Sequence, residues 1–182
     1  MKSIKEFSES LRGGVSKANL MDVKFYPCSK MMEKSPWREG LEFLTFKCES
    51  ADLPGKTFET QKTKEYVIER QTPLGVSFSD LNLNFICSTS MIERRFFDEW
   101  MEICLGTQTK RASYYKDIIS PKIEVTLYAG QSNIKSCSFK FINTYPLSIS
   151  SQAVGWEKNE VLRMTVNFSY EKWEVEYFEI SK

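Results

Sequence analysis

Residues 160–175, EVLRMTVNFSYEKWEV, alternate between large apolar side chains and polar ones. The apolar set is Leu162, Met164, Val166, Phe168 and Tyr170, and the positions between them carry Arg163, Thr165, Asn167, Ser169 and Glu171. A period of two is that of a β-strand with one buried face. A strand of this length cannot bury its apolar face alone, so it requires packed sheets or a closed barrel.

Shorter segments with the same alternation predict further strands over residues 19–26, 78–88, 122–128 and 136–146, and residues 41–48 are predicted as a strand that is apolar on both faces in places. The polar face of the last strand, 160–175, carries small side chains with few charges, a surface that tolerates water without being adhesive. The candidates for such a face are Asn82, Asn84, Ser136, Ser138, Thr165, Asn167 and Ser169.

One helix is predicted over residues 90–106, SMIERRFFDEWMEICLG. Ser90 and Glu93 have the spacing of a capping box, and Gly106 can end the helix. The apolar face is expected to pack across a sheet, and it contains Ile92, Phe96, Trp100, Ile103 and Cys104. Two ion pairs are expected on the other face, Arg94 with Asp98 and Arg95 with Glu99.

The chain is therefore expected to form one α+β domain, mainly β, over residues 19–182. Residues 1–18 place Ile4, Phe7 and Leu11 at helical spacing before Gly13-Gly14. They form an N-terminal arm, either frayed or ordered on a partner.

Two polar segments interrupt the strands. Residues 28–40 form an insertion in which Trp37 belongs either to an interface loop or to a simple turn. The second segment turns at Leu53-Pro54-Gly55 and continues with a polar run. Too polar for a core, this arm of about residues 53–70 is either a flexible loop or a protruding contact element.

Composition argues against an enzyme. The 182 residues include no histidine, which excludes Ser-His-Asp catalysis and histidine zinc sites. Five scattered cysteines indicate reduced thiols, and the net charge of +1 gives no strong field toward nucleic acid or membrane. The carboxylates near the C-terminus are expected on a solvated strand end, and they are Glu171, Glu174, Glu176 and Glu179. We expect no catalytic residue, no cofactor, no metal and no membrane insertion.

Three blocks of sequence, in order, resemble the tail tube proteins of contractile-tailed bacteriophages. The first is FKCESADLPGKTF (46–58), a strand ending in Cys followed by Ala-x-Leu-Pro. The second is DLNLNFICSTSMIERRFFDEW (80–100), a strand leading into a helix with Phe-x-x-Trp. The third (138–175) contains YPLSISS, a Gly-Trp turn and a last strand near Tyr-x-x-Trp.

The resemblance implies two packed antiparallel sheets with one flanking α-helix. Six copies would form a ring whose inner sheets join into a continuous β-barrel, and rings would stack into a tube that delivers phage DNA. The implied partners are further copies of the chain, the tail sheath, baseplate tube-initiator proteins, the tape measure protein, the tail terminator and DNA in transient passage. The implied location is the virion tail, assembled in the host cytoplasm.

The resemblance also assigns the arm to contacts between subunits or rings. The residues expected there are Leu53, Pro54, Gly55, Lys56 and Phe58, with Trp37 and Trp173 as further interface candidates. The length of the 28–40 insertion and the neutral net charge leave a second reading, a baseplate tube-initiator with the same fold. A monomeric adaptor or binding module is the third.

Overall fold

The computed structural model describes residues 19–33, 37, 41–65, 68–106, 113–129, 134–157 and 159–178. The predicted N-terminal arm, residues 1–18, lies outside these ranges. Nine strands account for most of the described chain: β1 (Met21–Tyr26), β2 (Cys48–Asp52), β3 (Lys56–Glu65), β4 (Ile68–Phe78), β5 (Leu81–Ile86), β6 (Ser120–Ala129), β7 (Ile134–Ile149), β8 (Arg163–Ser169) and β9 (Lys172–Tyr177). The helices are α2 (Ser29–Met32), α3 (Glu42–Lys47), α4 (Ile92–Cys104) and α5 (Tyr115–Ile118).

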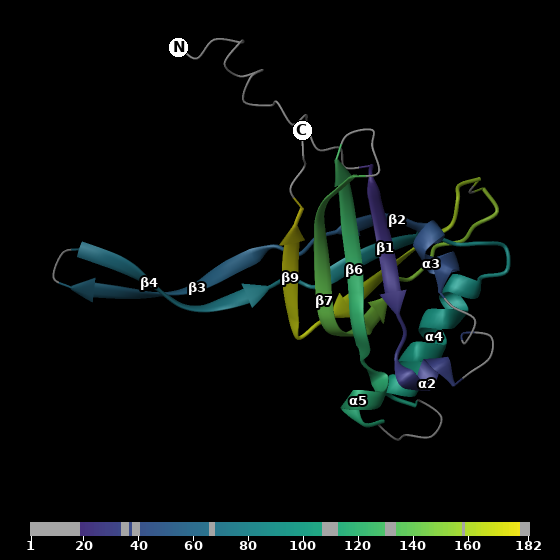
Figure 1. Ribbon diagram of the computed structural model, residues 1–182, viewed down its shortest axis with the longest axis horizontal. Coiled ribbons are helices and arrows are strands. Elements are labelled where there is room, and N and C mark those ends of the chain that lie inside the picture. The colour runs from purple at the N-terminus through teal and green to yellow at the C-terminus, as the bar shows by residue number, and fades with distance from the viewer. Residues whose placement is uncertain are drawn as a thin grey trace, which may run out of the picture.

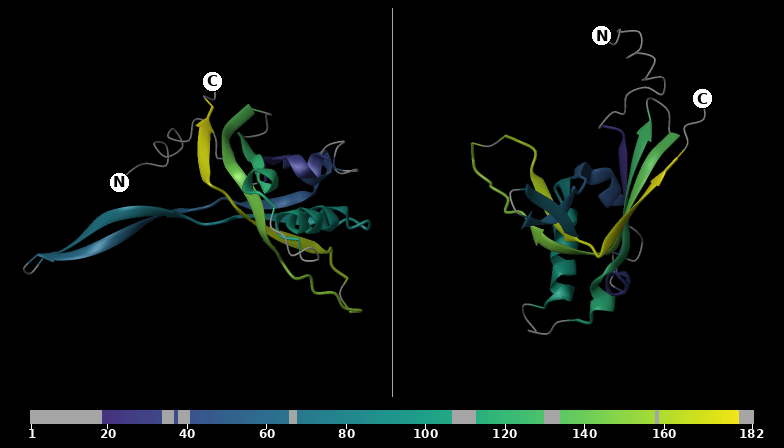
Figure 2. Two further views of the ribbon diagram at one scale, coloured as in Figure 1. Left: turned by 90° about the horizontal axis from the view of Figure 1, so that it is seen from below. Right: turned by 90° about the vertical axis from the view of Figure 1, so that its left-hand side faces the viewer.

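Seven of the strands form two antiparallel sheets that share β7. We call the sheet in the order β1-β6-β7-β9 sheet A, and the sheet in the order β7-β8-β5-β2 sheet B. The two sheets diverge from the shared strand in a V (Figure 2). The expectation of a mainly β fold with two antiparallel sheets is confirmed.

At the corner of the V, β7 passes from sheet A into sheet B, and the segment that contains β8 and β9 passes from sheet B into sheet A. β7 pairs with β9 up to Ile142 and with β8 from Tyr145, and between them Asn143 has a φ of 54°. The Asn143 side-chain amide donates a hydrogen bond to Glu171 Oε2, 2.5 Å away, opposite the bend. The segment 160–175 was predicted as one strand. It is interrupted at Tyr170–Glu171 and forms β8 in sheet B and β9 in sheet A, because a segment that changes sheets at a corner has to bend there.

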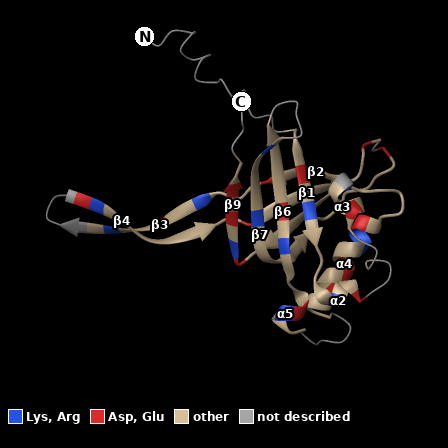
Figure 3. Cartoon of the chain, viewed as in Figure 1, with Lys and Arg blue, Asp and Glu red and all other residues tan. Residues whose placement is uncertain are grey.

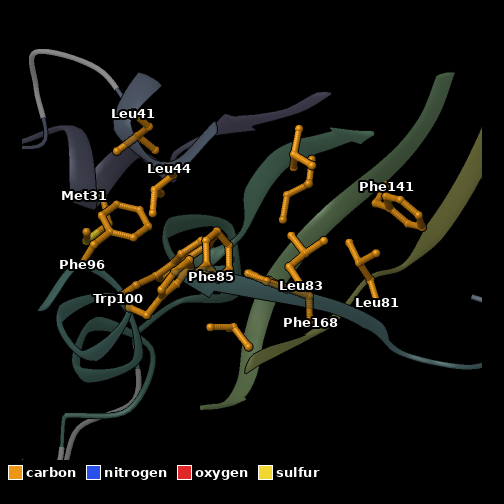
Figure 4. Packing of buried hydrophobic residues seen from close by; sticks show 14 of the residues in the cluster. Met31, Leu41, Leu44, Leu81, Leu83, Phe85, Phe96, Trp100, Phe141 and Phe168 are labelled. Carbon is orange, nitrogen blue, oxygen red and sulfur yellow. The ribbon is translucent and has the colours of Figure 1, made fainter. Parts of the chain in front are cut away.

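The core fills the space between the two sheets and α4 (Figure 4). Sheet B contributes the apolar faces of β5 and β8, whose alternation was predicted, and these residues are fully buried: Leu81, Leu83, Phe85, Met164, Val166 and Phe168. Aromatic rings from α4 meet them, with Phe97 lying 5.1 Å from Phe85 and 5.8 Å from Phe168 between ring centroids. Large aromatic rings thus tie the helix to sheet B.

Helix α4 confirms the predicted apolar face and both ion pairs. Phe96 and Trp100 are buried, while Arg94–Asp98 and Arg95–Glu99 approach to 3.0 and 2.8 Å. Its start differs from the prediction. Met91 is the N-cap in a left-handed conformation, and no side chain caps it.

Glu93 ties the beginning of α4 to the loop before it. Its carboxylate accepts hydrogen bonds from the backbone N–H and the hydroxyl of Ser88, at 3.1 and 2.8 Å. The carboxylate is buried beside Lys47 Nζ, 3.7 Å away. Burial disfavours the charged form, but hydrogen bonds from the backbone of Glu93 and from Ser88, with the charge of Lys47, outweigh it and lower the pKa of Glu93.

Two stretches were assigned wrongly from the sequence. Residues 41–48, predicted as a strand, form α3 up to Lys47, and β2 begins only at Cys48. Leu41 and Leu44 are three residues apart and both buried, which is helical spacing. The segment 28–40, predicted as a polar insertion, supplies α2 and the core residues Cys28, Met31 and Trp37.

The predicted arm is a ribbon of two long strands. β3 and β4 pair with each other from Lys56–Phe78 to Glu65–Ile68 and form a separate two-stranded sheet. Figure 1 shows this ribbon projecting from the body along the longest axis of the molecule. Residues 65–70 were expected to pair as an edge or protruding strand, but the ribbon continues to Phe78, since the rest of β4 had not been recognised.

Candidate assembly surfaces

The outer face of sheet B carries small polar side chains. We call this surface the polar face, and it consists of Ser50, Asp52, Asn82, Asn84, Ser148, Thr165, Asn167 and Ser169. The register places these residues opposite one another on adjacent strands, while their neighbours in sequence point into the core.

Hydrogen bonds connect the polar face from strand to strand. The Thr165 hydroxyl donates to Asn84 Oδ1 at 2.5 Å, and the Asn84 amide donates to Ser50 Oγ at 2.8 Å. In a parallel row the Asn167 amide donates to Ser148 Oγ at 3.0 Å. These five side chains bond one another, so part of the hydrogen-bonding capacity of the polar face is already used within the sheet.

The outer face of sheet A is charged instead. Lys140 Nζ on β7 lies 2.6 Å from Glu176 on the neighbouring strand β9, and within β9 Lys172 Nζ lies 2.9 Å from Glu174. The hydrogen bond to Glu176 raises the pKa of Lys140. Ser138, predicted with the small polar residues, lies on this sheet, where it is fully buried and donates to Glu124 Oε1 at 2.9 Å.

The outer edges of the two sheets differ in how they are covered. In sheet A, α3 lies beside β1, and the Thr45 hydroxyl donates a hydrogen bond of 2.6 Å to the carbonyl of Val23. In sheet B, β2 pairs with β5 on one side, and no other described strand pairs with its second side. An uncovered edge strand presents backbone groups that can pair with another chain.

The residues predicted for the arm lie at the base of the ribbon. Leu53 is half-buried against the core and Pro54 is half-buried beside it. Gly55 donates its backbone N–H to Ser79 Oγ at 3.0 Å, which joins the two ends of the ribbon. Lys56 and Phe58 are exposed, and Phe58 is 60% accessible despite its size.

The two tryptophans predicted for interfaces are placed inside the chain. Trp37 is 1% exposed; its ring meets Phe96 edge-on at 5.1 Å, and its Nε1 donates to Glu99 Oε2 at 2.7 Å. Trp37 is thus a core residue with no ring surface for a partner. Trp173 is half-buried, stacked on Phe139 at 5.8 Å. Among the described residues its buried Nε1 has no hydrogen-bond partner.

Exposed apolar residues missed by the sequence analysis lie in the loop between β7 and β8. Trp156 is fully exposed at the Gly-Trp turn, and Val154 and Val161 are exposed near it. The Gly-Trp turn had been used only as a mark of resemblance. The ribbon adds Leu74, Val76 and Phe78, which are also exposed.

A comparison with known families decides the identity. The profile of the family described as phage tail tube protein matches residues 16–176. The chain belongs to the phage tail tube protein family. No curated protein matches the sequence at a significant level.

Solved structures share the fold of this tail tube protein at low sequence identity. A chain of the sheath–tube complex of an extracellular contractile injection system (PVC), in its extended state, superposes with a TM-score of 0.63 at 12% identity, covering 98% of this chain and 100% of that one. The anti-feeding prophage cap, which terminates the AFP tube, gives 0.61 at 12% identity, covering 90% and 92%. The PVC sheath/tube terminator gives 0.59 at 10%, covering 88% and 95%.

Family membership makes this tail tube protein a structural component and not an enzyme. In the described part of the chain, no group of three or more acidic or cysteine side chains could hold a metal ion. None of the described helices is long and apolar enough to span a membrane.

Proposed function

We propose that this protein forms hexameric rings that stack into the inner tube of a contractile phage tail. The observation that carries the proposal is sheet B, which combines an uncovered β2 edge with a polar face and an apolar core side. Edge strands that pair between copies would remove the exposed edges and close six sheets into one barrel. Chains of the same fold occur in sheath–tube and tube-terminating assemblies.

In this arrangement the polar face of sheet B lines the channel. On this face Thr165 already donates to Asn84, Asn84 to Ser50, and Asn167 to Ser148. A passing polyanion such as DNA meets little positive charge, because Arg163 at the border of this face is held by Glu49 in two hydrogen bonds of 2.5 and 2.9 Å. Lysine or arginine contacts to phosphate would slow its passage.

Sheet A then faces away from the channel. Its charge ladder is suited to a polar, reversible contact with a surrounding sheath, since exposed ion pairs set complementarity more than affinity. The proposed partners are further copies of the chain, the sheath, baseplate initiator proteins, the tape measure protein and the terminator. The proposed place of assembly is the host cytoplasm, before incorporation into the virion.

A second function is open to the same fold. The AFP cap and a chain of the AFP baseplate resemble this chain as well as the PVC chain does, with TM-scores of 0.61 and 0.58 against 0.63. A protein at the end of the tube, such as a baseplate initiator, would form rings that do not elongate by themselves.

Light scattering and electron microscopy of the purified chain distinguish these functions. Long hollow tubes are expected for the main tube subunit, while single rings that elongate only when another protein is added indicate an end-of-tube protein. A chain that remains a monomer both alone and with isolated baseplates refutes both functions and leaves the adaptor reading.

A further inference from the structure

The β7–β8 loop presents a tryptophan entirely to solvent. Trp156 makes up the tip of this loop with Val154 close by in sequence, and both side chains are at least four-fifths exposed. A large ring in water forgoes the free energy of burial, so a cluster of this kind marks a surface that a partner covers. Tryptophan is also the residue type most enriched among those that dominate binding energy.

The base of the ribbon presents a second apolar surface. The register places Phe58 opposite Val76 and Lys56 opposite Phe78, and positions two apart share a face. Phe58, Val76 and Phe78 are therefore on one face of the ribbon, exposed by 60%, 42% and 43%. A two-stranded ribbon has no core of its own and gains stability from an element that covers such a face.

The base of the ribbon and the β7–β8 loop lie on opposite sides of the body. Figure 1 and the left view of Figure 2 both show the ribbon projecting from one end of the long axis and the β7–β8 loop from the other. Within one chain they cannot meet. Between two copies the contact joins unlike surfaces, head to tail, which repeats along a line instead of closing a dimer.

Charge favours the same pairing. Lys56 lies beside the apolar face, with its Nζ 5.9 Å from the centre of the Phe78 ring. The sequence after Trp156 contains Glu157, Lys158 and Glu160, a net charge of −1, and both glutamates are exposed. In Figure 3 red segments mark the β7–β8 loop, and a blue segment lies where the ribbon meets the opposite side of the body. Opposite charges at the rim of an apolar contact fix its register and partner.

We propose that Trp156 of one copy docks on the Phe58–Val76–Phe78 face of the next copy and that this contact stacks the rings. The inference rests on the proposed tube function and identifies the surface that receives each ribbon base. The ribbon of one copy, about 34 Å long, then runs past the loop and along the body of its neighbour. Farther out the ribbon carries exposed polar side chains such as Gln61, Thr63 and Glu69, which meet that body through polar contacts.

A photo-crosslink locates the contact directly. The full chain carrying p-benzoylphenylalanine in place of Phe58 is assembled, irradiated and digested, and crosslinked peptides are identified by mass spectrometry. The expected product joins position 58 of one copy to residues 150–162 of another. The matched control carries the same group in place of Thr57, whose side chain lies on the opposite face of the ribbon. It is expected to give little of that product.

A variant tests whether the contact stacks rings. Trp156→Ser is expected to form rings of normal size but to need an about 30-fold higher concentration to elongate, the loss expected for a dominant interface residue. Tyr114→Ser removes another strongly exposed aromatic ring and is expected to elongate normally.

The outcomes separate this inference from the proposed function. If the wild-type chain forms tubes but position 58 crosslinks elsewhere, or Trp156→Ser elongates like the wild type, the docking contact is wrong and the tube function stands. If position 58 crosslinks only to an added sheath protein, the occupant is wrong. If the wild-type chain assembles under no condition, the proposed function fails and this contact fails with it.

Discussion

Replacing Trp37 tests whether the segment 28–40 belongs to the folding core. The ring is 1% exposed and lies between Phe43 and Phe96, with centroid distances of 6.0 and 5.1 Å. Its Nε1 also donates a 2.7 Å hydrogen bond to Glu99. Removing the ring would open a cavity against α4 and leave that carboxylate without one donor.

The expected magnitude follows from these contacts. Trp37→Ala is expected to lower the free energy of unfolding by about 4 kcal/mol, the usual loss for a buried tryptophan. Trp37→Phe keeps most of the packing and loses the hydrogen bond, which contributes about 1 kcal/mol because the Glu99 side chain is 26% exposed and still pairs with Arg95.

Urea unfolding followed by circular dichroism measures both variants at a concentration where the chain is monomeric. With a slope of about 2 kcal/mol per molar urea, Trp37→Ala should lower the midpoint by about 2 M. Trp156→Ala is the control, because loss of its fully exposed ring should change the free energy of unfolding by no more than about 0.5 kcal/mol. A Trp37→Ala midpoint equal to that of the control would refute the assignment of Trp37 to the core.

Three further predictions concern other parts of the molecule. Glu93→Gln is expected to lower the free energy of unfolding by about 2 kcal/mol at pH 7. Because folding lowers the pKa of Glu93, the stabilisation by its carboxylate is present above the unfolded pKa of about 4.3 and is lost as the pH falls through the folded pKa. The stabilities of wild type and variant, measured by unfolding at decreasing pH, should therefore converge in acid. Burial raises the pKa of Cys48 and Cys104 to about 12. Both thiols should therefore react with iodoacetamide at pH 8 at least about tenfold more slowly in the folded chain than in the unfolded chain. Peptide mass spectrometry measures the two rates, and equal rates would contradict the burial of these thiols. Asn82→Lys with Asn167→Lys should leave tube assembly intact but slow DNA release from particles, whereas the double glutamine variant should not; unchanged release would argue against a channel lined by sheet B.

Much of sheet B and α4 was predictable from sequence. Alternation of apolar residues identified the buried faces of β5 and β8, and helical spacing identified the buried residues Phe96 and Trp100. In both cases the apolar residues recur with the period of the element, two for a strand and 3.6 for a helix, and so indicate the side that packs on the core. The segment 41–48 has apolar residues on both faces of a strand, so its period does not separate helix from strand. In the structure Leu41 and Leu44, three residues apart, are both buried, and this spacing puts them on one face of a helix.

Single residues were predicted less well than elements. Trp37 stands alone in a polar segment, where no period reveals burial, and a buried tryptophan is indistinguishable in sequence from the exposed Trp156. The part of β4 beyond Arg70 was not recognised because Pro73 and Gly75 are typical strand breakers. Here they are accommodated beside a register shift between Glu59 and Thr60.

Cryo-electron microscopy of the assembled protein tests the central claim most directly. The account predicts six-fold rings in which β2 pairs with a neighbouring subunit and sheet B encloses the channel, with Asn82 and Asn167 facing it. A channel lined by the charged face of sheet A, or rings in which β2 remains unpaired, would contradict it.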